Sequence, residues 1–99
     1  MIKIESPEQF QQETASGLVL VDFYTEWCGP CKKMLPVLEQ LSNVKVVKVN
    51  VEEQGDISEQ FSAYAVPTLV LLKDGKQVAK KVGLQTLDSL QGLINEQVN

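Results

Sequence analysis

The two cysteines of the chain, Cys28 and Cys31, are separated by two residues and have the clearest potential for chemistry. They follow an apolar run and precede a sequence typical of a helix, so we expect them at the start of that helix. Unpaired N–H groups and the helix dipole favour an anion there, which should lower the pKa of a thiol from about 8.5. One turn of helix brings both thiols to nearly one face, within reach of a disulfide.

The order of the two thiols predicts a thiol–disulfide exchange in which Cys28 is the exposed nucleophile and Cys31 the resolving thiol. Gly29 leaves the incoming sulfur unobstructed, and Pro30 suits the first turn of a helix because it has no N–H to pair. Two buried structural cysteines, or half of a metal site shared between two chains, are the alternatives. A purely structural disulfide is disfavoured because so short a loop constrains the unfolded chain little.

The composition excludes several other classes of site. The 99 residues carry a net charge of −4, and the nine cations are all lysines. Without histidine there is no Ser-His-Asp or Cys-His catalysis, and two cysteines cannot supply four ligands, so we expect no metal site. An acidic chain without arginine is not expected to bind nucleic acid. No apolar run is long enough to span a bilayer and the first residues lack a signal-peptide core, so we expect a cytoplasmic protein without a membrane segment.

The patterning of the rest of the chain predicts alternating strands and helices. Capping residues and proline open helices at Ser6-Pro7, near Cys28, at Asp56 and at Thr86, and the second helix should run past Leu41. Asp74-Gly75 predicts a tight hairpin. The order βαβαβαββα indicates an α/β fold with a mixed five-stranded sheet. The expected strands cover residues 2–5, 18–24, 44–51, 68–73 and 77–82.

Two of these helices make specific predictions about the core. In the third helix, Ile57, Phe61 and Tyr64 share one face, and the two aromatic residues are expected in the core. In the last helix, the residues expected on the buried side are Leu87, Leu90, Ile94 and Val98.

The segment Trp27-Cys28-Gly29-Pro30-Cys31-Lys32 resembles the active-site motif of the thioredoxin family. The similarity extends along nearly the whole chain, through the further segments Val21-Asp22-Phe23, Pro36, Val66-Pro67-Thr68, Lys73-Asp74-Gly75 and Val82-Gly83. The resemblance implies a single thioredoxin domain over residues 1–99, with helices on both faces of the sheet. It also implies a general protein-disulfide reductase that needs no bound cofactor, because the dithiol is the redox group.

The resemblance also implies partners. A thioredoxin reductase would supply two electrons, and ribonucleotide reductase, peroxiredoxins and methionine sulfoxide reductases would be among the protein disulfides reduced. We expect a monomer, since no large apolar patch is evident in the sequence.

Asp22 interrupts an apolar strand, where a buried carboxylate is costly and its pKa should rise. The resemblance places Asp22 below the dithiol, where it accepts the proton of Cys31, through water, and assigns Lys48 as its ion-pair partner. The alternatives are a solvated Asp22 at the strand end and an ordinary surface lysine at position 48.

The resemblance further assigns a shallow apolar contact surface for substrate. It implies a cis peptide bond at Pro67, which would place the backbone of Val66 beside Cys28, where an extended substrate segment could pair with it. Trp27, Gly29, Pro30 and Gly83 complete this surface. The alternatives are a trans proline in an ordinary turn and a Gly83 that only ends the fifth strand.

Three departures from the family pattern stand out. Tyr24 replaces a tryptophan found in many members, the stretch around Ser42-Asn43 is short, and the N-terminal segment is reduced.

Gly29-Pro30 lacks the histidine of disulfide oxidants and isomerases, and the chain lacks the Pro-Tyr spacer of glutaredoxins. A disulfide oxidant or isomerase, and a non-enzymatic binding subunit that uses the same apolar surface, remain the alternative functions.

Overall fold

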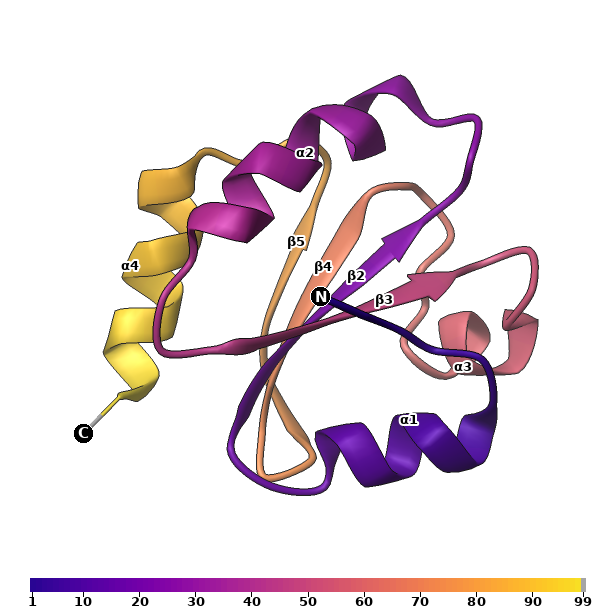
Figure 1. Cartoon of the computed structure of the whole chain (residues 1–99), viewed down its shortest axis with the longest axis horizontal. Helices are drawn as coiled ribbons and strands as arrows, with labels where there is room; N and C mark the ends of the chain where they lie inside the picture. The colour runs from indigo at the N-terminus through magenta and orange to yellow at the C-terminus, as the bar shows by residue number, and fades with distance from the viewer. Residues whose placement is uncertain (99) are drawn as a thin grey trace.

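A five-stranded sheet between two layers of helices forms the framework of the computed structural model, which describes residues 1–98 (Figure 1). The predicted order of elements is confirmed. The elements are β1 (Ile2–Lys3), α1 (Pro7–Thr14), β2 (Leu18–Tyr24), α2 (Gly29–Gln40), β3 (Lys45–Asn50), α3 (Gly55–Gln60), β4 (Thr68–Lys73), β5 (Lys76–Val82) and α4 (Leu87–Gln97).

The sheet has the strand order β1-β3-β2-β4-β5 and is mixed, as predicted. The strands β1, β3 and β2 run parallel, whereas β4 is antiparallel to both β2 and β5. In the register of β2 with β3, Asp22 lies opposite Lys48 and Tyr24 opposite Asn50. The central strand β2 has a neighbour on each side, and its side chains are buried in cores on both faces of the sheet, which explains why its apolar run is almost unbroken.

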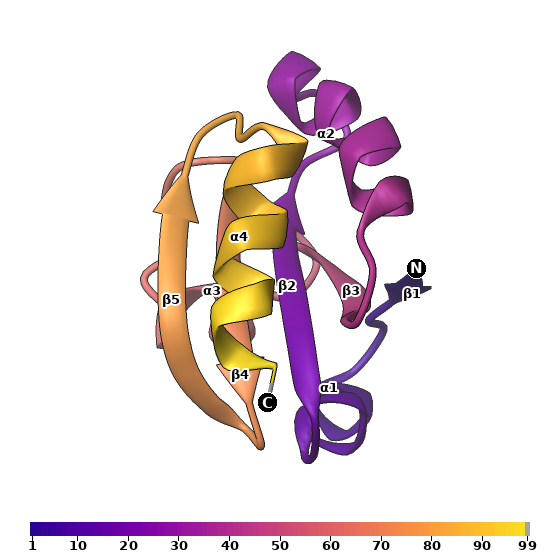
Figure 2. The same cartoon turned by 90° about the vertical axis from the view of Figure 1, so that its left-hand side faces the viewer.

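Alternate side chains of β2 enter two separate cores. Val19, Val21 and Phe23 belong to the core beneath α1 and α3. Leu20 belongs to the core beneath α2 and α4, and Tyr24 packs on the same side against the two cysteines. Helices α2 and α4 lie together on one side of the sheet and α1 and α3 on the other (Figures 1 and 2).

Three of the helices begin at a side-chain cap. The Ser6 Oγ accepts a hydrogen bond from the Gln9 N–H at the start of α1, and the Thr86 Oγ1 accepts one from the Ser89 N–H at the start of α4. Cys28 is the corresponding cap of α2. The Gln9 side chain does not return to the Ser6 N–H to complete a capping box, because it accepts from the Glu5 N–H instead.

The structure corrects three details of the predicted helices. Helix α2 ends at Gln40, because Leu41 is already extended. The side chain of Tyr64 is 80% exposed and not in the core, because α3 ends at Gln60 and Ser62 has a positive φ of 54° that breaks the helical period. Val98 lies beyond the end of α4 and is exposed, whereas Leu93 packs against the core.

Two long-range ties close the connections between elements. The Asp74-Gly75 hairpin has positive φ at both residues, and Asp74 exchanges hydrogen bonds with Gly17 through its carboxylate and its backbone N–H. The Gln91 side chain of α4 exchanges two hydrogen bonds with the backbone of Ser42, which follows α2 (3.0 and 3.1 Å).

Among residues 1–98, no helix combines the length and the apolar character needed to cross a membrane.

Candidate active site

Cys28 and Cys31 form a disulfide at the N-terminus of α2, with their Cα atoms 5.2 Å apart. Cys28 is the N-cap residue, and its Sγ accepts a hydrogen bond from the Cys31 N–H (3.1 Å). An unpaired N–H of the first helical turn is thus directed at this sulfur, as expected for a site that stabilises a thiolate. Cys28 is 9% exposed and Cys31 4%, so the predicted difference in exposure has the right direction but is small.

The disulfide has one apolar wall and one exposed rim. Tyr24 and Val66 pack against the two cysteines, so the strand end and the loop before β4 both reach the site. Trp27 is 86% exposed, and Gly29 and Pro30 are exposed as well. An exposed indole beside an exposed Gly-Pro pair gives an apolar rim on which a partner protein can dock.

The loop before β4 carries the cis peptide bond between Val66 and Pro67 that the resemblance implies. Pro67 is buried, and the half-buried side chain of Val66 packs against the two cysteines. The Gly83 N–H donates to the Pro67 carbonyl (2.8 Å). Gly83 therefore both follows the last residue of β5, with φ at +92°, and fixes this loop.

The same loop is fixed at its other end by a residue that the sequence did not indicate. The Lys80 Nζ of β5 donates to the carbonyls of Phe61 and Ser62 (3.0 and 3.1 Å), at the C-terminus of α3. A cation at this end of a helix also complements the helix dipole. A lysine in an edge strand is common, so its spacing in the sequence gives no signal of this role.

Asp22 lies below the dithiol with 0% exposure, so a solvated residue at the strand end is ruled out. Burial raises the pKa of its carboxyl from 3.8 to about 6, and the positive charge of Lys48 offsets part of that rise. Neither carboxylate oxygen has a hydrogen-bond partner within residues 1–98. Asp22 therefore has an unpartnered carboxyl group whose pKa is raised to about 6.

Lys48 does not form the ion pair with Asp22 that the resemblance implies, although the two residues are opposite each other in the register. Its Nζ instead lies 4.2 Å from the centroid of the Tyr24 ring, where it makes a cation–π contact. Lys48 thus acts on Asp22 only through its charge at longer range. The ion pairs in the described part of the chain join Lys3 to Glu53 and Lys45 to Glu13.

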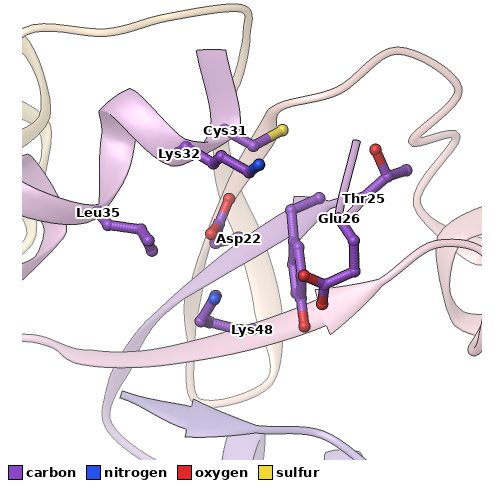
Figure 3. A pocket seen from close by; sticks show the side chains of 8 residues that line it. Asp22, Thr25, Glu26, Cys31, Lys32, Leu35 and Lys48 are labelled. Carbon is purple, nitrogen blue, oxygen red and sulfur yellow. The ribbon is translucent and has the colours of Figure 1, made fainter. Parts of the chain in front are cut away.

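A cavity of about 50 Å³ connects Asp22 with Cys31. In Figure 3 the Asp22 carboxylate lies between Cys31 and Lys32 of α2 on one side and Lys48 of β3 on the other. A volume of this size exceeds the 10–15 Å³ or so that one water needs. The remaining walls are formed by Tyr24, Thr25, Glu26 and Leu35.

Residues 1–96 match the family model described as Thioredoxin. The chain belongs to the thioredoxin family. It is 49% identical to the thioredoxin of Chlamydia caviae over 100 residues, which cover 97% of this chain and 98% of that protein. It is 40% identical to the thioredoxin of Bacillus subtilis over 94 residues, which cover 90% of each. The solved structure of a mutant thioredoxin from Halobacterium salinarum superposes with a TM-score of 0.92 at 34% identity, covering 99% of this chain and 90% of that one.

The thioredoxin fold and the thiol–disulfide oxidoreductase class that the sequence indicated are therefore confirmed. Family membership implies redox partners, namely a thioredoxin reductase and proteins that carry disulfides. The sequence did not indicate Tyr24 as a partner of Lys48. The available signal was its position two residues after Asp22, which in a strand places both side chains on one face of the sheet.

Proposed function

We propose that this thioredoxin-family chain is a general protein-disulfide reductase in which Cys28 and Cys31 are themselves the redox group, with no bound cofactor. The observation that carries the proposal is the disulfide at the N-terminus of α2, directly above a buried carboxyl group that has no hydrogen-bond partner among residues 1–98.

The reaction begins with the reduced dithiol. The Cys28 thiolate, stabilised by the Cys31 N–H and the start of α2, attacks one sulfur of a substrate disulfide. A mixed disulfide forms between Cys28 and the substrate, and the other substrate sulfur leaves as a thiolate and takes a proton from solvent. Cys28 has this role because it is the more exposed of the two cysteines.

Resolution requires the second thiol to lose its proton. Asp22 accepts the proton of Cys31 through water in the cavity that joins them, since a base with a pKa near 6 is matched to neutral pH. The Cys31 thiolate attacks the Cys28 sulfur, and the substrate leaves as its second thiolate, which is then protonated. Two electrons pass to the substrate, and the enzyme retains the Cys28–Cys31 disulfide.

The substrate contact is proposed to involve Trp27, Gly29, Pro30 and the loop at Val66 and Pro67. An extended segment that pairs with the Val66 backbone would carry its disulfide to Cys28, which Val66 contacts. Gly83 contributes by holding the Pro67 carbonyl. Lys48 is proposed to limit the pKa of Asp22 through its charge alone.

We propose specific partners on the strength of the family. A thioredoxin reductase would return the disulfide to the dithiol, and ribonucleotide reductase, peroxiredoxins and methionine sulfoxide reductases are the proposed recipients. The proposed state is a monomer in the cytoplasm, because the cycle requires a compartment in which the dithiol is kept reduced.

Reduction of insulin disulfides with NADPH and a bacterial thioredoxin reductase tests this function. We expect continuous NADPH oxidation that depends on both the chain and insulin, and Cys28→Ser should abolish it. A matched control is Ser89→Ala on α4, which should retain full turnover. If the parent chain fails to couple the reductase to insulin, but still captures proteins after Cys28 and Cys31 are both replaced by serine, the binding-subunit alternative is correct.

A further inference from the structure

Lys48 can reach two different partners on the same face of the sheet. Asp22 lies directly opposite it in the neighbouring strand, and Tyr24 is two residues further along β2. The Nζ lies over the Tyr24 ring, and the oxygens of Asp22 accept no hydrogen bond from residues 1–98. The Lys48 ammonium therefore contacts the Tyr24 ring, although the strand register places Lys48 opposite the Asp22 carboxylate.

The location of these groups makes this choice of partner physically reasonable. Tyr24 is buried against the disulfide, so its ring is fixed, whereas Lys48 is half-buried and has a long flexible side chain. A close ion pair with Asp22 would require the ammonium to lose most of its water next to a carboxylate with 0% exposure. Contact with the negative face of a ring satisfies the ammonium at a lower cost in lost hydration.

We propose that Tyr24 is a positioning residue: its ring holds the Lys48 ammonium and thereby leaves the Asp22 carboxyl free to exchange a proton with Cys31. The role in proton exchange rests on the proposed function, whereas the arrangement of Tyr24, Lys48 and Asp22 does not.

This contact between Lys48 and Tyr24 keeps the pKa of Asp22 in a range suited to accepting a proton from Cys31. An opposite charge in close contact lowers a carboxyl pKa by about 1–3 units, which would leave a weak base at neutral pH. With Lys48 on the ring, burial dominates and the pKa of Asp22 remains near 6. The titratable and charged groups that share the cavity with Asp22 are Lys48 from β3, Cys31 and Lys32 from α2, Glu26 from the preceding loop, and Tyr24.

A titration of Asp22 in the oxidised protein, followed through its carboxyl ¹³C shift, tests the arrangement without any measurement of activity. Tyr24→Phe keeps the ring face, so the midpoint should remain within a few tenths of a pH unit of the parent. Tyr24→Leu removes the ring and releases Lys48 toward Asp22. Its midpoint should fall by about one pH unit or more. Equal midpoints for the two variants would overturn the proposal.

The smaller leucine side chain could also admit water to Asp22, so each variant is repeated with Lys48→Met. In that background, Tyr24→Phe and Tyr24→Leu should titrate alike, because the cation is absent. A downward shift that persists without Lys48 would assign the effect to solvent and overturn the proposal. If Tyr24→Leu does not fold, Lys48→Met alone decides: a midpoint rise of less than about one unit fits a distant lysine, and a larger rise overturns the proposal.

The pH profile of insulin reduction separates this inference from the function on which it rests. Tyr24→Leu should move the acidic limb of the profile to lower pH by the same amount as the Asp22 titration, and Tyr24→Phe should leave it in place. A shifted titration with an unchanged profile would support the positioning of Lys48 and contradict the role of Asp22 in the reaction. An unshifted titration contradicts the inference whatever the activity.

Discussion

Val19, Val21 and Phe23 on one face of β2 belong to a hydrophobic core, whereas Asp22 and Tyr24 on the other face lead to a buried carboxyl group and a disulfide. These residues alternate in one strand, so neighbouring positions differ by a rotation to the opposite face of the sheet. The first face is closed by α1 and α3 and the second by α2 and α4 (Figure 2).

The comparison shows how a small domain accommodates a destabilising group. Burial of a charge without a close partner costs stability, and apolar packing elsewhere in the domain must offset that cost. The apolar face of β2 provides part of this compensation within the same strand. Substitutions on the two faces should therefore have different effects. Those on the apolar face should lower stability, and those on the face with the disulfide should lower turnover.

The largest expected effect is on the chemical face. Cys31→Ser should abolish turnover and trap a mixed disulfide between Cys28 and substrate, because no second thiolate can release it. Mass spectrometry without reductant should detect the adduct, and Cys28→Ser serves as the control that forms none. A Cys31→Ser variant that turns over like the parent would contradict the two-thiol mechanism.

The next effect is on the apolar face. Phe23 has 0% exposure and packs with Phe61, so Phe23→Ala should lower the free energy of unfolding by about 3–5 kcal/mol. Denaturant titration measures this loss, and turnover per folded molecule should be retained. The control is Trp27→Ala at the exposed rim, which should change stability by less than about 0.5 kcal/mol. A loss below about 1 kcal/mol for Phe23→Ala would show that this face is not the stabilising one.

Asp22→Asn should have the opposite sign on stability. Because the folded pKa is raised, folding favours the protonated carboxyl, and Asp22 lowers stability as the pH rises from 3.8 through about 6. At 1.36 kcal/mol per pH unit, the variant should be more stable than the parent by about 3 kcal/mol above pH 7, and the difference should fall below about 1 kcal/mol by pH 4.

Denaturant titrations of the parent and Asp22→Asn at pH 4 and pH 8 measure this difference. The same variant should reduce insulin more slowly at neutral pH, and a higher pH should recover part of the rate because solvent then deprotonates Cys31. A stability difference that does not change between the two pH values would contradict the buried, titrating carboxyl group.

The smallest effect is at the helix cap on the apolar side. Ser6→Ala removes the hydrogen bond to the Gln9 N–H and should cost about 1 kcal/mol, with no change in turnover. The matched variant on the chemical side is Thr86→Ala, which removes the cap of α4 and should cost a similar amount. A change in turnover for Ser6→Ala would show that the two faces are more closely coupled than their cores suggest.

The sequence predicted the elements closely because local signals and tertiary packing agree in most of them. The apolar run of β2, the turn at Asp74-Gly75 and the caps at Ser6 and Thr86 are each local features that the structure keeps. The prediction that Tyr64 lies in the core is wrong because its local signal and the observed backbone disagree. Its helical spacing from Ile57 is real, but the backbone reverses at Ser62 before the helix reaches it, and no residue in that stretch signals the reversal.

In the candidate site, the sequence predicted the location of the groups better than their partners. Burial of Asp22 follows from the apolar residues around it, and the structure places Lys48 opposite it in the neighbouring strand. Whether the Lys48 side chain contacts the carboxylate or the aromatic ring, however, depends on a small difference in hydration and contact energy. Such a difference depends on the three-dimensional arrangement of Tyr24 and the dithiol, which the spacing of residues does not contain.

The hydrogen bonds between Gln91 and Ser42 have a further consequence for how this chain could be altered. One amide side chain closes the short connection between α2 and β3, in the way that a neighbouring strand would, and Asn43 then reverses direction with φ at +65°. Because Gln91 lies on α4, the position of Ser42 is fixed from outside the connection and does not depend on how many residues the connection contains. Residues inserted after Asn43 should bulge outward as a new loop while both helices stay in place, which makes this a suitable point for grafting a peptide epitope onto the scaffold.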